Sequence, residues 1–224
     1  MQVVVVGSGQ LARELMEGLW RSSDFELVLW ESPDLSEVPS LVVHAGSGRQ
    51  LPQVMEFCDR TQSTLLEMST NSELKGRPIG FPVVLCPNAN LLMLKFMSMI
   101  AASARLFAGC QVTIEESHQA NKTSEPGTAV ALALSLGLQR RDVVSIRDPE
   151  RQAQELGVPP GSLHRHAVHR VRIESEGCQL NLESRVLDNA PYVQGVMRIL
   201  DALRCRELAR RIYRVEEFVS LGWL

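Results

Sequence analysis

The sequence has few of the residues that mark secreted, metal-binding or nucleic-acid-binding proteins. Its five cysteines are odd in number and form no CxxC pair, so neither a disulfide framework nor a zinc site is indicated. The formal net charge is -3, which gives no basic excess to hold a phosphate backbone. No run approaches the ~18 apolar residues of a membrane span, and the chain opens on a strand-like run instead of a basic leader. We therefore expect a cytoplasmic protein that binds neither nucleic acid nor a membrane.

The first residues carry a nucleotide-binding pattern. The apolar run 3–6 leads directly into Gly7-Ser8-Gly9-Gln10-Leu11-Ala12 and then into an amphipathic helix pattern. This is the strand, tight turn and helix that a dinucleotide fingerprint requires. Gly7 permits the turn, Gly9 lets the backbone approach a pyrophosphate, and Ala12 stands where the helix meets the strand. The expected cofactor-binding residues in this segment are Gly7, Gly9, Gln10 and Leu11.

An acidic residue follows the next apolar strand, which runs from Glu26 to Trp30. Glu31 lies about 20 residues beyond the glycines, where a carboxylate accepts hydrogen bonds from a ribose 2′-OH. The same carboxylate repels a 2′-phosphate, and no basic residue directly follows it. We therefore expect NADH as the preferred cofactor. NADPH stays open as the alternative because Arg49 lies on a later loop of the same half.

The order of the expected elements changes near residue 109. Before it, strands (3–6, 26–30, 40–44, 63–67, 82–86) alternate with helices (10–19, 49–59, 89–107), which is the pattern of a parallel sheet. After it, longer strands are expected at 111–116, 164–174 and 178–186, with helices at 126–136 and 191–204, while 148–162 is expected to be a variable loop. We predict an α/β fold with an N-terminal Rossmann-type parallel sheet over 1–108. A C-terminal α+β substrate and oligomerisation domain with a mixed sheet is predicted over 109–195, and 196–224 is expected to pack back on the first domain.

The segment from Glu116 to Ala129 brings together residues suited to an acidic small molecule. His118 and Lys122 can donate protons or hold carboxylates, and Gly127-Thr128 opens a helix whose backbone N–H groups and hydroxyl suit an anion. A single His-Lys pair is more often solvated surface than a site. Its occurrence in a nucleotide-binding chain favours proton chemistry.

Taken together, these motifs resemble the dihydrodipicolinate reductase family. The resemblance rests on the GxG half, the E-x-H-x-x-x-K segment with its Pro-Gly-Thr-Ala turn, Asn88 before a long helix, and Ser145-Ile146-Arg147. It implies an oxidoreductase of lysine and diaminopimelate biosynthesis that reduces a cyclic dicarboxylate imine with a nicotinamide cofactor. It implies that His118 and Lys122 are catalytic, and that Gly127 and Thr128 bind a substrate carboxylate. It places Ser69, Thr70 and Asn88 near the nicotinamide ring and the hinge.

The chain also departs from this family's pattern. Gln119 stands where a second histidine is usual, and the turn at Glu125-Pro126-Gly127 is one residue shorter and carries a negative charge. Losing one charge-assisted contact is worth roughly 1.5–3 kcal/mol, enough to change the preferred substrate. A glutamine can still donate one hydrogen bond, although without the charge of an imidazolium, so we count Gln119 among the substrate-binding residues. A reductase or amino-acid dehydrogenase acting on another imine or 2-oxo acid stays open.

Other features have simpler explanations. On one strand, His164 and His166 would share a face and His169 would point away, with no acid or cysteine to complete a metal site, so we expect no metal. His166 is either near the substrate or a plain surface histidine. The second sheet has no obvious covering layer, which favours a homodimer or homotetramer. A non-catalytic NAD(P)-binding module remains as a hypothesis of a different class.

Overall fold

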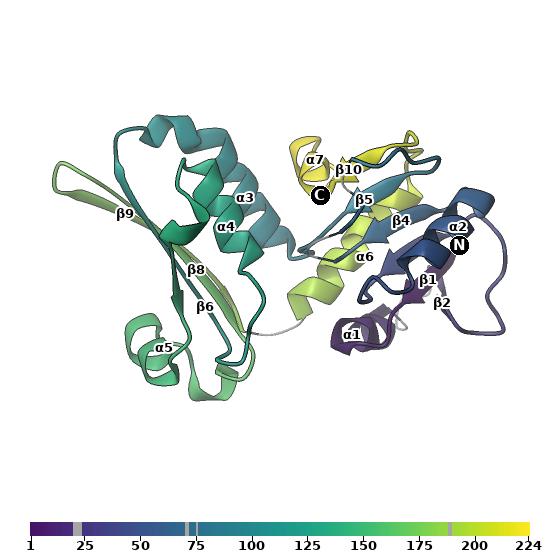
Figure 1. Cartoon of the computed structure of the whole chain (residues 1–224), viewed down its shortest axis with the longest axis horizontal. Helices are drawn as coiled ribbons and strands as arrows, with labels where there is room; N and C mark the ends of the chain where they lie inside the picture. The colour runs from purple at the N-terminus through teal and green to yellow at the C-terminus, as the bar shows by residue number, and fades with distance from the viewer. Residues whose placement is uncertain (20–23, 70–71, 75, 188–189) are drawn as a thin grey trace. The chain divides into compact units, whose positions relative to one another are not determined.

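The computed structural model describes residues 1–19, 24–69, 72–74, 76–187 and 190–224 of the chain (Figure 1). They cluster into two compact units. The first combines Met1–Leu94 with Ala190–Leu224, and the second comprises Lys95–Asn189. Among the described residues, no helix is both long and apolar enough to cross a membrane. The assignment of cofactor to one domain and of substrate to the other stays a prediction.

The first unit is built on a six-stranded sheet in the order β10-β5-β4-β3-β1-β2, and every pairing in it is parallel. Its strands are β1 (Gln2–Val6), β2 (Glu26–Leu29), β3 (Leu41–His44), β4 (Thr64–Glu67), β5 (Val83–Leu85) and β10 (Ile212–Arg214). Residues along β1 and β3 are almost fully buried, as continuous apolar runs in a parallel sheet require. The Rossmann-type parallel sheet expected for this half is confirmed.

Helices cover both faces of this sheet, and the side chains of β1 alternate between them. Val3 and Val5 pack in the core that contains α1 (Gln10–Leu19) and α6 (Ala190–Arg204), while Val4 and Val6 pack in the core that contains α2 (Leu51–Thr61). The short α7 (Val215–Ser220) adds Phe218 to the first of these cores. The strand order reverses between β1 and β3. In an open α/β sheet of this kind, ligands bind at that switch point, beyond the carboxyl ends of the strands.

The second unit contains a mixed sheet in the order β7-β6-β8-β9, as expected. Its strands are β6 (Gln111–His118), β7 (Val143–Ile146), β8 (Ala167–Ser175) and β9 (Cys178–Val186). β6 runs parallel to β7 and antiparallel to β8, which forms a hairpin with β9. The helix α3 (Leu91–Ser103) starts in the first unit and leads, through the 3-10 turn Ala104–Phe107, to β6. α4 (Gly127–Ser135) packs against β6 and β7.

The expectation of a variable loop over 148–162 is wrong. The segment contains the helix α5 (Pro149–Leu156) and the 3-10 turn Pro160–Ser162. Asp148 caps α5 by accepting a hydrogen bond from the backbone N–H of Arg151 at 2.8 Å, and Gly157 ends it at φ +60°. Pro149 stands at the first helical position and Gly157 just past the last, which are places where proline and glycine bound a helix. The same residue types also occur in loops, which is why the sequence pattern favoured a loop.

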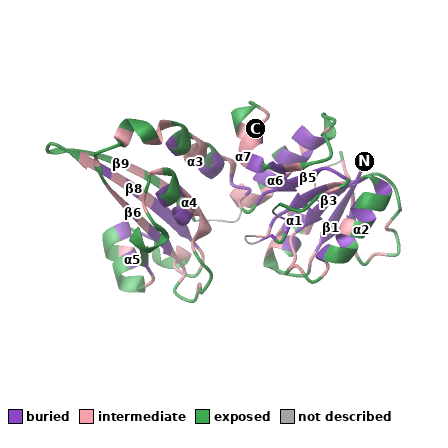
Figure 2. Cartoon of the chain, turned by 45° about the horizontal axis from the view of Figure 1, so that its top comes forward, coloured by how far each residue is buried: buried purple, intermediate pink, exposed green. Residues whose placement is uncertain are grey.

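The two faces of the mixed sheet differ in polarity. One face carries an ion-paired row across three strands, in which Arg170 contacts Glu115 at 3.2 Å and Glu183 at 2.8 Å. Figure 2 shows much of the β8–β9 hairpin as exposed or intermediate, in contrast to the buried β1 and β3. The expectation that a second copy of the chain covers this sheet stays a prediction.

Candidate active site

A cavity of about 580 Å³ lies at the switch point of the parallel sheet. Its lining comprises Gly7, Ser8, Gly9, Glu31, Ala45, Gly46, Ser47, Arg49 and Gln50, which follow β1, β2 and β3. Gly7 has φ +125°, and a Cβ there would lie 2.8 Å from the carbonyl oxygen of Ala45, so only glycine fits. A Cβ on Gly9 would meet nothing within 4 Å, which leaves its backbone open to an approaching group. The site therefore fits a dinucleotide at its phosphate end.

The N-terminus of α1 adds to this fit. Gln10 and Leu11 begin the helix, Leu11 packs against the core, and Gln10 donates to Glu14 at 3.1 Å. Ala12 is buried where the helix meets the sheet. Backbone N–H groups in the first turn of a helix have no intrahelical acceptor and attract anions.

Glu31 and Arg49 both line this cavity, so both signs of charge are present where the ribose is expected. Gln50 donates to the Glu31 carboxylate at 3.1 Å, and Arg49 donates to Ser47 at 3.1 Å. The carboxylate keeps acceptor capacity for a 2′-OH, whereas Arg49 is suited to a 2′-phosphate. The two residues on which we expect the choice between NADH and NADPH to depend therefore line one cavity.

The other expected cofactor residues lie away from the glycine loop. Ser69 follows β4 and lines a second cavity of about 760 Å³, beside Pro87 at the end of β5. Asn88 follows Pro87, and its side chain accepts a hydrogen bond from the backbone N–H of Asn90 at 2.9 Å. Thr70 lies outside the described residues.

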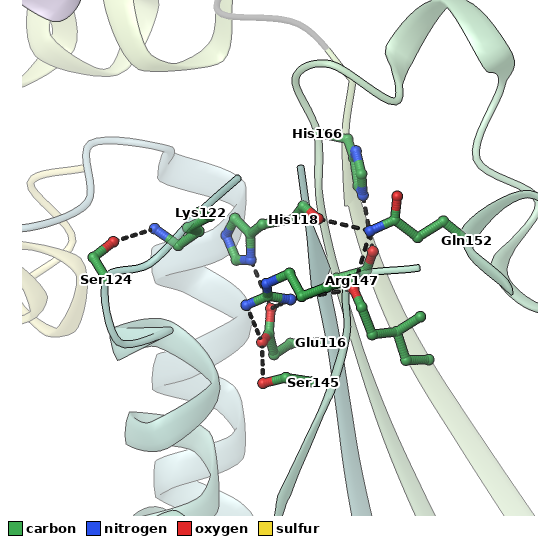
Figure 3. A network of polar contacts seen from close by, with 10 residues as sticks. Glu116, His118, Lys122, Ser124, Ser145, Arg147, Gln152 and His166 are labelled. Atoms are coloured by element: carbon green, nitrogen blue, oxygen red, sulfur yellow. Dashed lines mark hydrogen bonds and ion pairs between the residues drawn. The ribbon is translucent and has the colours of Figure 1, made fainter. Parts of the chain in front are cut away.

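In the second unit, His118 is held by a buried carboxylate two residues earlier on β6. Its Nδ1 lies 2.6 Å from Oε2 of Glu116, whose side chain is fully buried. Arg147, at the end of β7, contacts Oε1 of the same carboxylate at 2.6 Å, and Ser145 also donates to it. Figure 3 shows His118, Arg147 and Ser145 converging on Glu116. His118 Nε2, with no hydrogen-bond partner among the residues that the structure describes, is the ring atom left for a ligand.

The charge state of Glu116 follows from these contacts. Burial would raise the pKa of its carboxyl, but hydrogen bonds from His118, Arg147 and Ser145 outweigh burial and lower the pKa to about 2. Glu116 is therefore ionised throughout the physiological range. An ionised partner at Nδ1 fixes the orientation of the His118 ring.

Lys122 lies in the turn after β6 and donates to Ser124 Oγ at 2.9 Å. Figure 3 shows its side chain beside His118. Partial burial and the nearby guanidinium of Arg147 lower the pKa of Lys122, whereas the charge of Glu116 opposes that shift. A lysine whose proton is more readily lost is suited to proton donation as well as to holding a carboxylate.

The three histidines of the 164–169 segment lie in different surroundings. His166 lies before β8, with Nε2 2.8 Å from the hydroxyl of Ser117, and no metal-binding group of acids, cysteines or histidines occurs among the described residues. His169 lies opposite Glu116 in the β6–β8 pairing, whereas His166 contacts Ser117, the next residue of β6, which faces the other side of the sheet. The His169 ring meets that of His118 edge to face, at 5.6 Å between centroids. The strand starts at Ala167, three residues later than predicted, so His164 and His166 precede it.

The ring of His169 is buried, and neither of its nitrogens has a hydrogen-bond partner in the described part of the chain. Burial, with a smaller contribution from His118, lowers the pKa of His169 to about 4. This histidine is therefore neutral at physiological pH and forms an uncharged wall beside His118.

The segment 119–127, which is predicted to bind the substrate and is called the substrate turn here, leads into α4. The backbone carbonyl of Gln119 accepts a bond from Lys122 N–H at 3.0 Å, and the N–H of Gly127 donates to the carbonyl of Glu125 at 2.9 Å. Thr128 lies in the first turn of the helix. The added negative charge is compensated, because Arg140 contacts the Glu125 carboxylate at 2.9 Å.

Sequence reasoning missed the residues that hold His118 in place. Glu116 and His118 are two apart on a strand, a spacing that puts both on one face, and Ser145 of β7 and Arg147 just after it repeat this spacing. Gln152 of α5 donates to the carbonyl oxygens of His118 at 2.7 Å and Ile146 at 3.0 Å. The E-x-H and S-x-R spacings were visible signals, whereas nothing in the sequence pointed to Gln152.

A doubly wound unit with a glycine-lined cavity at its switch point, together with a mixed-sheet unit that carries a His-Lys-carboxylate cluster, defines a class of two-unit α/β proteins. Comparison with known proteins narrows this class. The family model for the C-terminal part of dihydrodipicolinate reductase matches residues 91–219, more than half of the chain. The chain belongs to the dihydrodipicolinate reductase family.

Individual relatives agree with this membership. The chain is 31% identical over 96 residues to a probable 4-hydroxy-tetrahydrodipicolinate reductase 2 of rice, covering 40% of this chain and 30% of the rice protein. It is 29% identical over 126 residues to the Arabidopsis thaliana reductase 2, covering 52% and 36%. Both relatives are described as chloroplastic, and the matches span only about a third of their length.

A solved structure shows the fold. The dipicolinate-bound dihydrodipicolinate reductase of Paenisporosarcina sp. TG-14 superposes with a TM-score of 0.71 at 14% identity. The match covers 97% of this chain and 98% of that one, so both units share its fold.

Proposed function

We propose that this protein is an NAD(P)H-dependent reductase of a cyclic imine dicarboxylate, acting as 4-hydroxy-tetrahydrodipicolinate reductase in lysine and diaminopimelate biosynthesis. The observation that carries the proposal is the Glu116-held His118 beside Lys122, in a chain of this family. The dipicolinate in the related solved structure supports a planar dicarboxylate as the ligand class.

The first unit would hold the cofactor at the switch point of its sheet. Gly7, Gly9 and the start of α1 would take the pyrophosphate, and Glu31 would take the adenosine ribose. When bound, the cofactor supplies a hydride. We propose NADH as the preferred form because Glu31 offers an acceptor to a 2′-OH, with Arg49 as the residue that would admit NADPH.

The second unit would prepare the substrate for that hydride. Reduction of a C=N bond requires the nitrogen to be protonated or hydrogen-bonded, so that the electron pair is accommodated. His118 would present Nε2 to the reacting group, because Glu116 occupies Nδ1. Lys122 would donate the proton or hold one carboxylate. Thr128 and the first turn of α4 would hold the other carboxylate, with Gln119 beside them.

A different substrate is the second candidate. Gln119 supplies no positive charge where the family pattern has a histidine, and the Gly127 N–H is already bonded to Glu125. Both observations favour weaker recognition of a second carboxylate, hence another imine or a 2-oxo acid. A non-catalytic NAD(P)-binding module is disfavoured because the residues for handling protons are present.

Calorimetric titration with dipicolinate tests the proposed substrate class. We expect NADH-dependent binding that Lys122→Ala and Thr128→Val each weaken by about tenfold, the loss of one charge-assisted bond. Arg172→Ala, on the polar face of the sheet, is the control. If pyrrolidine-type monocarboxylates bind and dipicolinate does not, the alternative substrate class replaces the first.

Assembly and location complete the proposal. We propose a homodimer or homotetramer, to be checked by light scattering, and a cytoplasmic location, to be checked by cell fractionation. The related plant proteins are described as chloroplastic, so an organellar location is the outcome that would contradict the latter.

A further inference from the structure

A second buried His–Glu contact lies in the first unit, at the carboxyl ends of β3 and β4. His44 and Glu67 are the last residues of these strands and stand opposite each other in the parallel register. The Nδ1 of His44 is 2.6 Å from Oε2 of Glu67, and both side chains are 0% exposed. Nothing in the proposed chemistry uses either residue, and a fully buried ionisable pair requires an explanation.

The other oxygen of Glu67 is occupied by Ser69. It accepts a hydrogen bond from the Ser69 backbone N–H at 3.0 Å and another from the Ser69 hydroxyl. A serine hydroxyl has one hydrogen and two lone pairs. Because the hydrogen is directed at Glu67, the Ser69 oxygen faces its surroundings as an acceptor only. Ser69 is partly exposed and lines the cavity beside Pro87.

The far side of the His44 ring lies against the loop that lines the cavity at the switch point of the sheet. We call this cavity, which Gly7 and Gly9 also line, the glycine-loop cavity. A Cβ on Gly46 would lie 3.0 Å from Nε2 of His44, and Gly46 lines that cavity with Gly7 and Gly9. Nε2 is buried and, among described residues, has no hydrogen-bond partner. The ring thus packs directly beneath the loop after β3, while its other nitrogen is tied to the residue that holds Ser69.

We propose that this His44–Glu67–Ser69 network is a positioning device for the cofactor, in which His44 and Glu67 fix the Ser69 oxygen as an acceptor for the carboxamide N–H of nicotinamide. The inference rests on the proposed function and deepens it at the cofactor site. A carboxamide presents two N–H donors and one acceptor, so an acceptor that cannot rotate into a donor selects one orientation of the amide.

Direct binding measurements test the network without turnover. We compare NADH with ADP-ribose, which lacks nicotinamide, by calorimetry on wild type, Glu67→Gln, Ser69→Ala and the double variant. Each single variant should weaken NADH about tenfold, the value of a hydrogen bond to a well-held partner, and leave ADP-ribose within about twofold. The double variant should be no weaker than the worse single one, because both changes remove the same contact.

Glu37→Gln provides the matched control. Glu37 pairs with Arg60 at 2.6 Å in the same unit, but on the surface, so its change should alter neither constant. Equal weakening of NADH and ADP-ribose in the variants, or no weakening, would overturn the network while leaving the proposed function intact. Failure of wild type to bind either ligand would overturn the proposed function and the network together. If Glu67→Gln does not fold by circular dichroism, an unchanged NADH to ADP-ribose ratio in Ser69→Ala still overturns the inference.

Discussion

The two units contain the same contact in different surroundings. In each, a histidine Nδ1 lies 2.6 Å from a glutamate Oε2. In the first unit both side chains are sealed from solvent, whereas in the second the His118 side chain is 16% exposed. The sealed pair can only position its neighbours. In the open pair Nδ1 is occupied and the ring is partly exposed, so exposure of the ring separates a structural histidine from a candidate catalytic one.

The groups that hold the two glutamates also differ between the units. Glu67 is held by His44 and the adjacent Ser69, without an ion pair to arginine among the described residues. Glu116 has Arg147 as a permanent cation in addition to His118. A carboxylate with its own guanidinium stays charged whatever the histidine does.

The largest expected effect concerns the open histidine. His118→Ala should lower turnover by about 10²–10⁴-fold, the usual contribution of a positioned acid or base, with the NADH dissociation constant unchanged. His164→Ala is the matched control, because that side chain is exposed in the same unit. Equal losses of turnover in the two variants would show that His118 has no special role in turnover.

The next effect is on stability. Glu116→Gln should destabilise the protein by about 3 kcal/mol, since it leaves the partly buried Arg147 without its carboxylate. Glu115→Gln, on the polar face of the same strand, should cost less than about 1 kcal/mol. Urea unfolding measures both changes, and similar losses would contradict the assigned role of Glu116.

The pH dependence of that effect has a defined sign. The folded-state pKa of Glu116 is depressed from 4.5 to about 2, so its stabilisation is complete above pH 4.5 and is lost as the pH falls toward 2. The wild-type stability curve should therefore fall more steeply than that of Glu116→Gln in this window. Parallel curves would show that the depression is absent.

His169 should act in a higher pH window. Its pKa is lowered from 6.5 to about 4, so the unfolded chain takes up its proton first and stability falls as the pH drops from 6.5 to 4. The loss should be on the order of 2–3 kcal/mol, and His169→Phe should remove it. The exposed His164→Phe is the control, and identical slopes in the two variants would contradict the burial of an unpartnered ring.

Cofactor preference should respond to the two charges in the glycine-loop cavity. Glu31→Ala should shift the ratio of NADH to NADPH dissociation constants about tenfold toward NADPH, the value of one hydrogen bond to a charged group. Arg49→Ala should shift it in the opposite direction. An unchanged ratio in both variants would remove these residues from cofactor selection.

The smallest effect tests the substrate turn. Arg140→Ala frees the Glu125 carboxylate beside Gly127, and should raise KM for a dianionic substrate by about twofold to threefold. Added salt should reduce the difference by screening. A lower KM in the variant would show that this carboxylate does not face the substrate.

Much of the fold could be predicted from local pattern. The valine run, the glycine turn and the acid after the second strand each carry their own signal, and β1, α1 and β2 lie where these signals predict. The candidate site was predictable only where it follows the chain, at His118 and Lys122. Glu116, Arg147 and Gln152 come together from β6, β7 and α5, and strand order is set by tertiary packing that no window of sequence contains.

The most direct test of the account is oxidation of NADH, followed by absorbance, with the dihydrodipicolinate precursor generated in place by its synthase. We expect turnover in wild type that disappears in His118→Ala while NADH binding persists. NADH binding without turnover, together with reduction of a different imine or 2-oxo acid, would contradict the proposed substrate.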